Sequence, residues 1–133
     1  KIILKKFINK ENLNDKIKLI DFAENPYPII KQTEILVLSS KYEGLPNVLL
    51  EAQVLKKFII SSDCPTGPRE ILLNGKGGLL FKVGDFKELS EKIKYYQKNK
   101  KNLKKLVSQS YRQLNRFDHD SNLKKYFELV RRV

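Results

Sequence analysis

The sequence has one cysteine, one histidine and no long apolar run. A lone cysteine, Cys64, cannot form an intrachain disulfide and is typical of a protein from a reducing compartment. One His and one Cys are too few for a zinc site of the His/Cys type. No apolar run approaches the roughly 18 residues that a membrane span needs, and no signal peptide is recognisable. These scarcities argue against a disulfide framework, a zinc site and a membrane-spanning helix.

Arginine is also scarce, although the chain is strongly basic. The formal net charge is +12, and only 5 of the 27 basic residues are Arg. The surplus is uneven, because residues 1–84 hold 13 basic and 9 acidic side chains while residues 85–133 hold 14 and 6. Such a surplus attracts anionic partners. Since Arg dominates the recognition of base edges, we interpret the charge as a surface property and expect no nucleic-acid partner.

Length and composition favour one compact domain. The chain has 133 residues, of which 41% are hydrophobic, and this is enough apolar content for a core. The chain starts at Lys1, without Met, directly in helix-like sequence, so we expect a fragment of a longer protein. We expect a single partial domain, with an α/β core in residues 1–84 and a helical extension in residues 85–133.

Apolar periodicity divides the chain into alternating strands and helices. The expected strands are 17–22, 35–38, 58–60 and 77–83. The expected helices are 1–12, 28–32, 46–56 and 69–73, then 85–98, 101–115 and a last helix capped by Asp118 or Asp120. This alternation predicts an α/β fold with a mostly parallel sheet of about four strands, followed by C-terminal helices.

Two details of this pattern bear on burial. The runs at 35–38 and 58–60 are continuously apolar, which is typical of strands buried on both faces. The run at 17–22 alternates in part, as expected near a sheet edge. One stripe of the last helix is expected to face inward, and it consists of Leu123, Tyr126, Phe127 and Val130.

The most informative stretch runs from an expected strand through a loop that contains Glu43 and into the helix that contains Glu51. Ligands of parallel sheets bind at the carboxyl ends of strands, where this loop lies. Gly44 permits close approach of the backbone, and the helix N-terminus offers free N–H groups to an anion. If the helix extended back to Glu43, the two carboxylates would stand about 12 Å apart along its axis and about 80° apart around it.

Residue chemistry alone leaves the roles of these two carboxylates open. An unpaired buried carboxylate is costly, so Glu51 in its apolar helix must reach solvent, a basic partner or the hydroxyls of a ligand. The alternative is structural: Glu43 would be an acidic residue favourable near a helix N-terminus, and Glu51 half of an ion pair. For Cys64 and His119, a structural thiol and a surface or capping side chain are the favoured interpretations.

The frame Ser40-Lys41-Tyr42-Glu43-Gly44-Leu45-Pro46-Asn47-Val48-Leu49-Leu50-Glu51-Ala52 resembles the signature of retaining glycosyltransferases of family 4, which have the GT-B fold. Other segments, before and after this frame, resemble the family in order and spacing along most of the chain. They are 17–26, 35–40, 58–63, 67–80 and 85–93. The resemblance implies a Rossmann-like sheet and the C-terminal, donor-binding half of a GT-B enzyme.

The resemblance also implies a role for each matching residue. Glu43 would be catalytic, because it would contact the donor sugar and stabilise charge developing at the anomeric carbon. Glu51 would bind the ribose hydroxyls of the nucleotide. Backbone groups approaching the sugar and phosphates would come from Gly44, Leu45, Pro46 and Asn47. The nucleotide base would lie near Phe22 and Asn25, and the donor pocket would be flanked by Gly67, Pro68 and Glu70.

The implied reaction is transfer of a sugar, with retention, from a nucleotide donor, with no metal and no cofactor. Segment 67–72 resembles that of bacterial members, which favours a UDP-sugar donor. The expected acceptor is a growing cell-envelope or capsular glycan. The family's first two C-domain strands and its N-terminal acceptor domain are absent here, so we expect the chain alone to be inactive. The missing first strand would lie between 17–22 and 35–38. The sheet must therefore close differently, gain a strand from a partner or belong to a longer protein.

Two other functions remain as alternatives. One is a basic nucleic-acid-binding module, which the scarcity of Arg and the absence of a basic-aromatic strand motif disfavour. The other is a non-catalytic partner-binding α/β domain. We interpret the lysine-rich stretch at 98–105 as a solvated junction between two helices. The alternative interpretation is peripheral contact with an anionic membrane. The expected location is the cytoplasm, at or near the inner face of the cell membrane.

Overall fold

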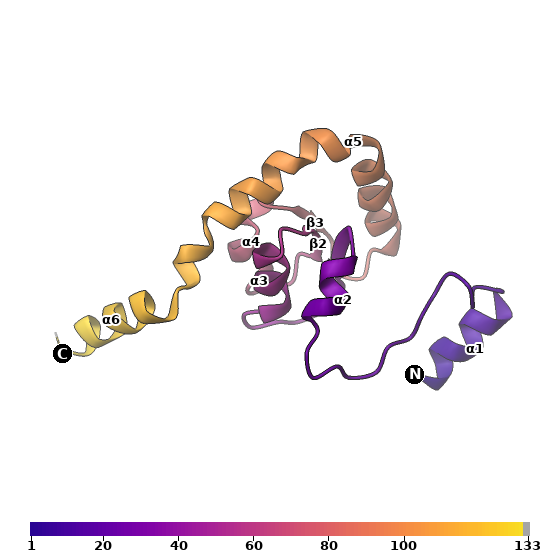
Figure 1. The fold of residues 1–133 in the computed structure, drawn as a ribbon, viewed down its shortest axis with the longest axis horizontal. Coiled ribbons are helices and arrows are strands. Elements are labelled where there is room, and N and C mark those ends of the chain that lie inside the picture. The colour runs from indigo at the N-terminus through magenta and orange to yellow at the C-terminus, as the bar shows by residue number, and fades with distance from the viewer. Residues whose placement is uncertain (132–133) are drawn as a thin grey trace.

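The computed structural model describes residues 1–131, and Figure 1 shows helices around a small central sheet. The strands are β1 (Ile35–Leu38), β2 (Phe58–Ser62) and β3 (Leu79–Phe81). The helices are α1 (Ile2–Lys10), α2 (Tyr27–Gln32), α3 (Asn47–Val54), α4 (Pro68–Ile71), α5 (Phe86–Arg112) and α6 (His119–Val130), and two short 3-10 helices are η1 (Leu73–Gly75) and η2 (Leu114–Phe117).

The sheet is parallel, with strand order β1-β2-β3, which confirms the predicted α/β class. The central strand β2 is buried at all five positions. The prediction that 35–38 is buried on both faces is wrong, because β1 is an edge strand and Val37 is 41% exposed. Val37 lies opposite Ile60 in the register, so burial rises sharply from one strand to the next.

The sheet has three strands rather than about four, because residues 17–22 form no strand. A β-strand is stabilised by hydrogen bonds to a neighbour, and no strand in residues 1–131 lies beside the free edge of β1 to provide one. The segment therefore runs as irregular chain from α1 toward α2, and Figure 1 shows α1 standing away from the sheet. Apolar alternation alone did not distinguish this segment from a paired strand.

Two apolar clusters cover the two faces of the sheet. Because successive strand residues point to opposite faces, Ile59 joins one cluster while Phe58 and Ile60 join the other. The first cluster consists of Ile30, Leu49, Ala52, Ile59, Ile71 and Leu72. The second is closed by α5 and consists of Phe58, Ile60, Phe81 and Leu103. Helices thus lie on both faces, and they hold the strand ends in fixed positions.

The central position of β2 gives a direct test of this core. Ile60→Ala removes a side chain that is fully buried in the second cluster, and we expect it to lower the free energy of unfolding by about 2–5 kcal/mol. Val37→Ala, on the register partner, is the matched control and should cost less than about 1 kcal/mol because the side chain is already partly solvated. Urea titration followed by circular dichroism measures both, and equal losses would contradict the assigned burial.

The two helices expected at 85–98 and 101–115 are confirmed as the two helical segments of α5, which meet at a kink. Asp85 caps α5 by accepting a hydrogen bond from the backbone N–H of Glu88 at 2.9 Å. The kink is at Asn99, which has non-helical φ −122° and ψ 20° and whose side chain donates to the Tyr95 carbonyl at 2.9 Å. The first half of α5 packs with Leu89 and Ile93, and the second half with Leu103.

The last helix, α6, is capped as predicted but is not buried. Asp118, rather than Asp120, is the cap, because its carboxylate accepts from the Ser121 N–H at 2.9 Å. Hydrogen bonding to Ser121, first to its side chain and then to its backbone N–H, lowers the pKa of Asp118. The expected inward stripe is exposed instead, at 41% for Leu123 and 62% for Tyr126, because α6 extends away from the sheet (Figure 1). Phe127 and Val130 are likewise more than half exposed. None of the described helices is both long and apolar enough to cross a membrane.

Candidate functional site

Three loops leave the same edge of the sheet, because parallel strands end on the same side. Hydrogen bonds join these loops to one another. The Ser62 hydroxyl donates to the Ser40 carbonyl at 2.7 Å, and the Asp63 N–H donates to the Phe81 carbonyl at 2.8 Å. Each loop is thereby tied to its neighbour close to the strand ends.

The loop that carries Glu43 is also fixed against the loop after β2. The Thr66 hydroxyl donates to the Glu43 carbonyl. Gly67 packs directly on the loop, since a Cβ built there would lie 2.4 Å from the Gly44 carbonyl oxygen and 2.5 Å from Pro46 Cδ. Gly67 also has φ +85°, a conformation that favours glycine. The structure therefore brings together Glu43, Gly44, Pro46 and Gly67 from two predicted motifs.

Glu43 lies in the loop and not on the helix. Because α3 begins at Asn47, the helical relation of Glu43 and Glu51 considered from the sequence is wrong. Both side chains are half-buried. No buried side-chain nitrogen or oxygen atom in residues 1–131 lacks a partner, so both carboxylates reach either a hydrogen-bond donor or the surface.

Glu51 sits on the outer face of α3. Leu49, Ala52 and Gln53 point into the core, where Gln53 donates to the Ile71 carbonyl at 3.0 Å. Glu51 follows Asn47 by one helical turn and so shares its face. Within residues 1–131 Glu51 forms no salt bridge and accepts no side-chain hydrogen bond, so the structural ion pair left open by the sequence is not formed there. Its carboxylate is available to a ligand.

The other residues that the sequence predicted for the site have fewer contacts with the two loops. Phe22 is 95% exposed, and Asn25 accepts from the Tyr27 N–H at 3.0 Å in the turn before α2. Leu45 lies in the loop between β1 and α3 and is exposed. Pro68 is buried at the start of α4, and the carbonyl of Glu70 accepts from Arg116 at 3.2 Å. Phe22 and Asn25 are therefore not part of the cluster formed by the two loops.

A cavity of about 650 Å³ lies at the same sheet edge. Sequence reasoning missed this cavity, because its lining comes from all three loops and from the start of α5. The lining residues with a charged or hydroxyl-bearing side chain are Lys41, Tyr42, Asp63, Lys82 and Glu88. The sequence signal that could have identified them is their position just after a strand. Lys41, Tyr42, Asp63 and Lys82 each lie within four residues of a strand end.

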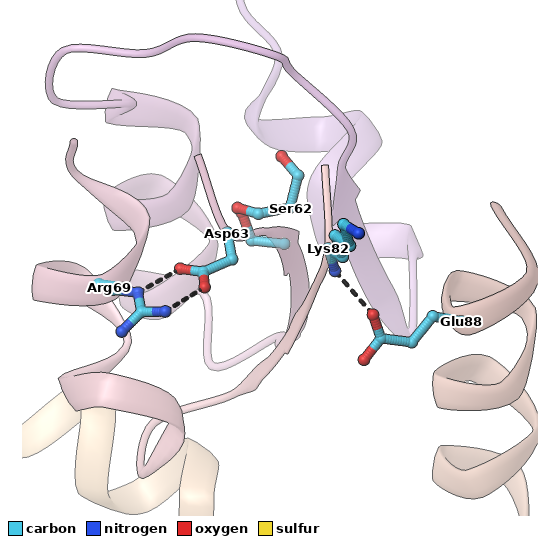
Figure 2. Close-up of polar contacts among 6 residues, drawn as sticks. Ser62, Asp63, Arg69, Lys82 and Glu88 are labelled. Atoms are coloured by element: carbon cyan, nitrogen blue, oxygen red, sulfur yellow. Dashed lines mark hydrogen bonds and ion pairs between the residues drawn. The ribbon is translucent and has the colours of Figure 1, made fainter. Parts of the chain in front are cut away.

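Figure 2 shows how the two carboxylates of this cavity are held. Asp63 forms a bidentate ion pair with Arg69, and this contact raises the pKa of Arg69. Glu88 accepts a hydrogen bond from the Lys82 N–H at 2.7 Å and lies 3.4 Å from the Lys92 ammonium. Both acidic side chains are therefore neutralised by groups of the protein itself.

A family model described as "Glycosyl transferases group 1" matches residues 3–113. The chain belongs to this family. The match includes the strands, the three loops and all of α5, so the edge described above is part of a glycosyltransferase group 1 domain.

Relatives of this group 1 transferase domain are found in archaea and bacteria. The chain is 46% identical over 69 residues to an uncharacterized glycosyltransferase of Methanocaldococcus jannaschii, which covers 52% of this chain and 17% of that protein. It is 32% identical over 80 residues to CapM of Staphylococcus aureus, a capsular polysaccharide biosynthesis glycosyltransferase. The aligned residues make up 60% of this chain and 21% of that protein. The chain thus spans about a fifth of the length of these relatives.

The fold of the group 1 domain is also shared with solved structures. The crystal structure of Anabaena HepE in complex with UDP matches with a TM-score of 0.87 and 18% identity, over 98% of this chain and 36% of that chain. This likeness confirms the predicted GT-B type of α/β fold over nearly the whole chain.

In residues 1–131 of this transferase domain, no group of three or more His, Cys, Asp and Glu side chains is placed to hold a metal ion. Cys64 is buried, at 1% exposure. The exposed His119 contacts only Asp120, at 3.1 Å.

Proposed function

We propose that the chain is the donor-binding part of a retaining glycosyltransferase of family 4. The complete enzyme transfers a sugar from a UDP-sugar to a cell-envelope or capsular glycan and uses neither a metal nor a cofactor. Alone, the 133-residue chain binds the donor weakly and transfers nothing. The enzyme works in the cytoplasm, with peripheral contact to an anionic membrane through the lysines of 98–105.

One observation carries this proposal: the loop with Glu43 leads into α3 with Glu51, and Gly67 clamps it from the neighbouring loop. The free N–H groups at the start of α3 favour an anion such as the donor diphosphate. Glu51, on the same face as Asn47 and free of salt bridges in residues 1–131, accepts hydrogen bonds from two ribose hydroxyls.

The relatives support the substrate classes in this proposal. HepE was solved in complex with UDP, and CapM belongs to capsular polysaccharide biosynthesis. In this chain, Glu43 stabilises the positive charge that develops at the anomeric carbon, because a fixed carboxylate lowers the energy of a nearby cationic transition state. Gly44, Leu45, Pro46 and Asn47 line the approach to the sugar and phosphates. Gly67, Pro68 and Glu70 flank the donor, and Phe22 and Asn25 border the base.

The test is a titration of the chain with UDP, followed by NMR shifts, with GDP and ADP as controls. Glu51→Ala should raise the Kd for UDP by about tenfold, because the nucleotide loses charge-assisted hydrogen bonds to its ribose. Glu91→Ala is the matched control, since Glu91 is an exposed carboxylate on α5, and it should leave the Kd unchanged. UDP shifts that avoid residues 43–51, or a Kd unaffected by Glu51→Ala, would contradict the proposed site.

A further inference from the structure

A groove of about 550 Å³ lies at the edge of the sheet where the strands begin. Its lining comes from the turn before β1, the turn before β2 and the middle of α5. Ile35 pairs with Phe58, and these are the first residues of two parallel strands, so the two turns meet at one place. At about 3.3 Å per residue, these short strands separate the groove from the loop of Glu43 by roughly 13 Å. The groove is therefore a separate feature from the proposed donor site.

The groove is basic, and its charges come from two elements. Four of its lining residues are lysines, namely Lys56, Lys57, Lys100 and Lys104. Within residues 1–131, Glu34 is the only acidic residue of the lining, and its Oε2 lies 2.6 Å from Lys100 Nζ. This ion pair ties α5 to the turn before β1 and neutralises one lysine. No carboxylate in the described part of the chain forms a salt bridge with the other three.

Two of these lysines are held by contacts that leave their charge intact. Lys57 Nζ donates a hydrogen bond to the Lys31 carbonyl of α2 at 2.6 Å. Lys56 Nζ lies 4.6 Å from the centre of the Tyr111 ring of α5. A carbonyl or an aromatic ring orients an ammonium group without neutralising it. One ammonium group is thus directed toward α2 and the other toward α5, so positive charge spreads along the edge.

The second half of α5 continues this basic edge beyond the groove. From residue 92 to residue 117 the sequence has nine basic residues and no acidic one. Lys101, Lys105 and Arg112 are exposed at spacings of four and seven residues, which places them on one face of the helix. At 1.5 Å per residue this row is about 16 Å long. Lys101 and Lys105 directly follow the groove residues Lys100 and Lys104 in the sequence, so row and groove are continuous.

An extended anionic surface fits this basic edge better than a single small anion or a nucleic acid. A small anion contacts only a few of charges spread over about 16 Å. Seven of the nine basic residues in 92–117 are lysines, which lack the forked geometry that reads base edges. Tyr95 and Tyr111 of α5 are 50% and 42% exposed, and tyrosine rings favour the boundary between lipid head groups and water. Lysine clusters of this kind are typical of surfaces that bind anionic lipids.

We propose that the basic edge binds an anionic lipid surface, with the groove lysines Lys56 and Lys57 acting together with the lysines of α5. The inference rests on the proposed function, which assigns membrane contact to 98–105, and it adds a second element to that contact. The groove receives the phosphate of a lipid head group. Because the groove and the donor loops lie at opposite edges of the sheet, lipid and UDP bind at the same time. The acceptor is left to the rest of the complete enzyme.

The experiment measures co-sedimentation of the 133-residue chain with phosphatidylcholine vesicles, alone or with about a third of the lipid replaced by phosphatidylglycerol. The chain should bind the phosphatidylglycerol vesicles at least about tenfold more tightly, and added salt should weaken this binding. Saturating UDP should not release the chain. Double-stranded DNA of mixed sequence should not displace it from the vesicles either.

The double variant Lys56→Gln with Lys57→Gln tests the part of the basic edge that lies outside α5. It should raise the Kd for phosphatidylglycerol vesicles by about tenfold or more, because two charges near the lipid are lost. Lys56→Arg with Lys57→Arg keeps the charge and should retain binding. Lys41→Gln with Lys82→Gln is the matched control, because it removes the same charge from exposed positions at the other edge of the sheet. Circular dichroism of each variant separates lost binding from lost folding.

Four results would each overturn the proposal: equal binding to the two kinds of vesicle, displacement by UDP, displacement by DNA, or equal losses in the two Gln variants. If UDP binds near 43–51 while Lys56→Gln with Lys57→Gln leaves vesicle binding unchanged, the basic-edge proposal alone fails. If UDP binds nowhere while vesicle binding requires Lys56 and Lys57, the donor-site proposal fails and the lipid-binding edge stands.

Discussion

Replacing Glu43 by Gln in the complete transferase should lower sugar transfer by roughly 100-fold or more while leaving UDP affinity unchanged. The substitution keeps the size of the side chain and removes its negative charge. The position of the loop should not change, because it is the Glu43 carbonyl, not the carboxylate, that accepts from Thr66. The expected loss is therefore confined to the transition state, where positive charge develops on the donor sugar.

The measurement is release of UDP from a panel of UDP-sugars (glucose, galactose, N-acetylglucosamine and N-acetylgalactosamine) in the presence of acceptor membranes. Glu91→Gln is the control for loss of one negative charge, and it should retain full activity, since Glu91 is exposed on α5 and lines none of the cavities described. Full activity in Glu43→Gln would remove Glu43 from the mechanism. A parallel loss of UDP affinity would show instead that the carboxylate holds the nucleotide.

Gly67→Ala should destabilise the clamp between the two loops by about 2–4 kcal/mol. Two costs combine, because an alanine at φ +85° is strained and its Cβ would meet the Gly44 carbonyl and Pro46 Cδ at 2.4 and 2.5 Å. Both contacts are to atoms held by the backbone or by a proline ring, so neither moves easily. Urea titration followed by circular dichroism measures the loss, and UDP binding should weaken with it.

Two other glycines separate these costs. Gly84 has φ +78° with nothing within 4 Å of an added Cβ, so Gly84→Ala should show the conformational cost alone, about 1 kcal/mol. Gly44 has no positive φ, and a Cβ added there would have nothing within 4 Å, so Gly44→Ala should leave stability nearly unchanged. If all three variants lost the same amount, the close packing of Gly67 on the loop would be refuted.

The parts of the fold that sequence predicted are those governed by local pattern. Apolar runs located β1 and β2, and Asp85 marked the start of α5 through its capping side chain. The errors concern tertiary context. Residues 17–22 alternate as a strand does, but a strand also needs a neighbour, and the pattern of a single segment cannot supply one. The apolar stripe of α6 is exposed although its periodicity predicts burial. Periodicity shows which residues share a face of a helix, but it does not show whether another element covers that face.

The difference between local pattern and tertiary context also explains which parts of the candidate site the sequence predicted. Glu43 and Glu51 stand in one continuous motif, so their sequence spacing was sufficient to single them out. The clamp by Gly67 and the cavity between Lys41 and Lys82 join residues that are 23 and 41 positions apart in the sequence. Only the strand register brings such pairs to one edge, and the register depends on packing on both faces of the sheet.

The open edge of β1 determines how copies of this chain behave toward one another. Its outward N–H and C=O groups are not paired within residues 1–131, and Val37 beside them is 41% exposed, so the edge offers a template for a strand of another copy. A net charge of +12 keeps copies apart at low ionic strength, but at 0.15 M salt the Debye length is only about 8 Å. Self-association through this edge should therefore rise with salt and with concentration, and dilute, low-salt solution should disfavour it.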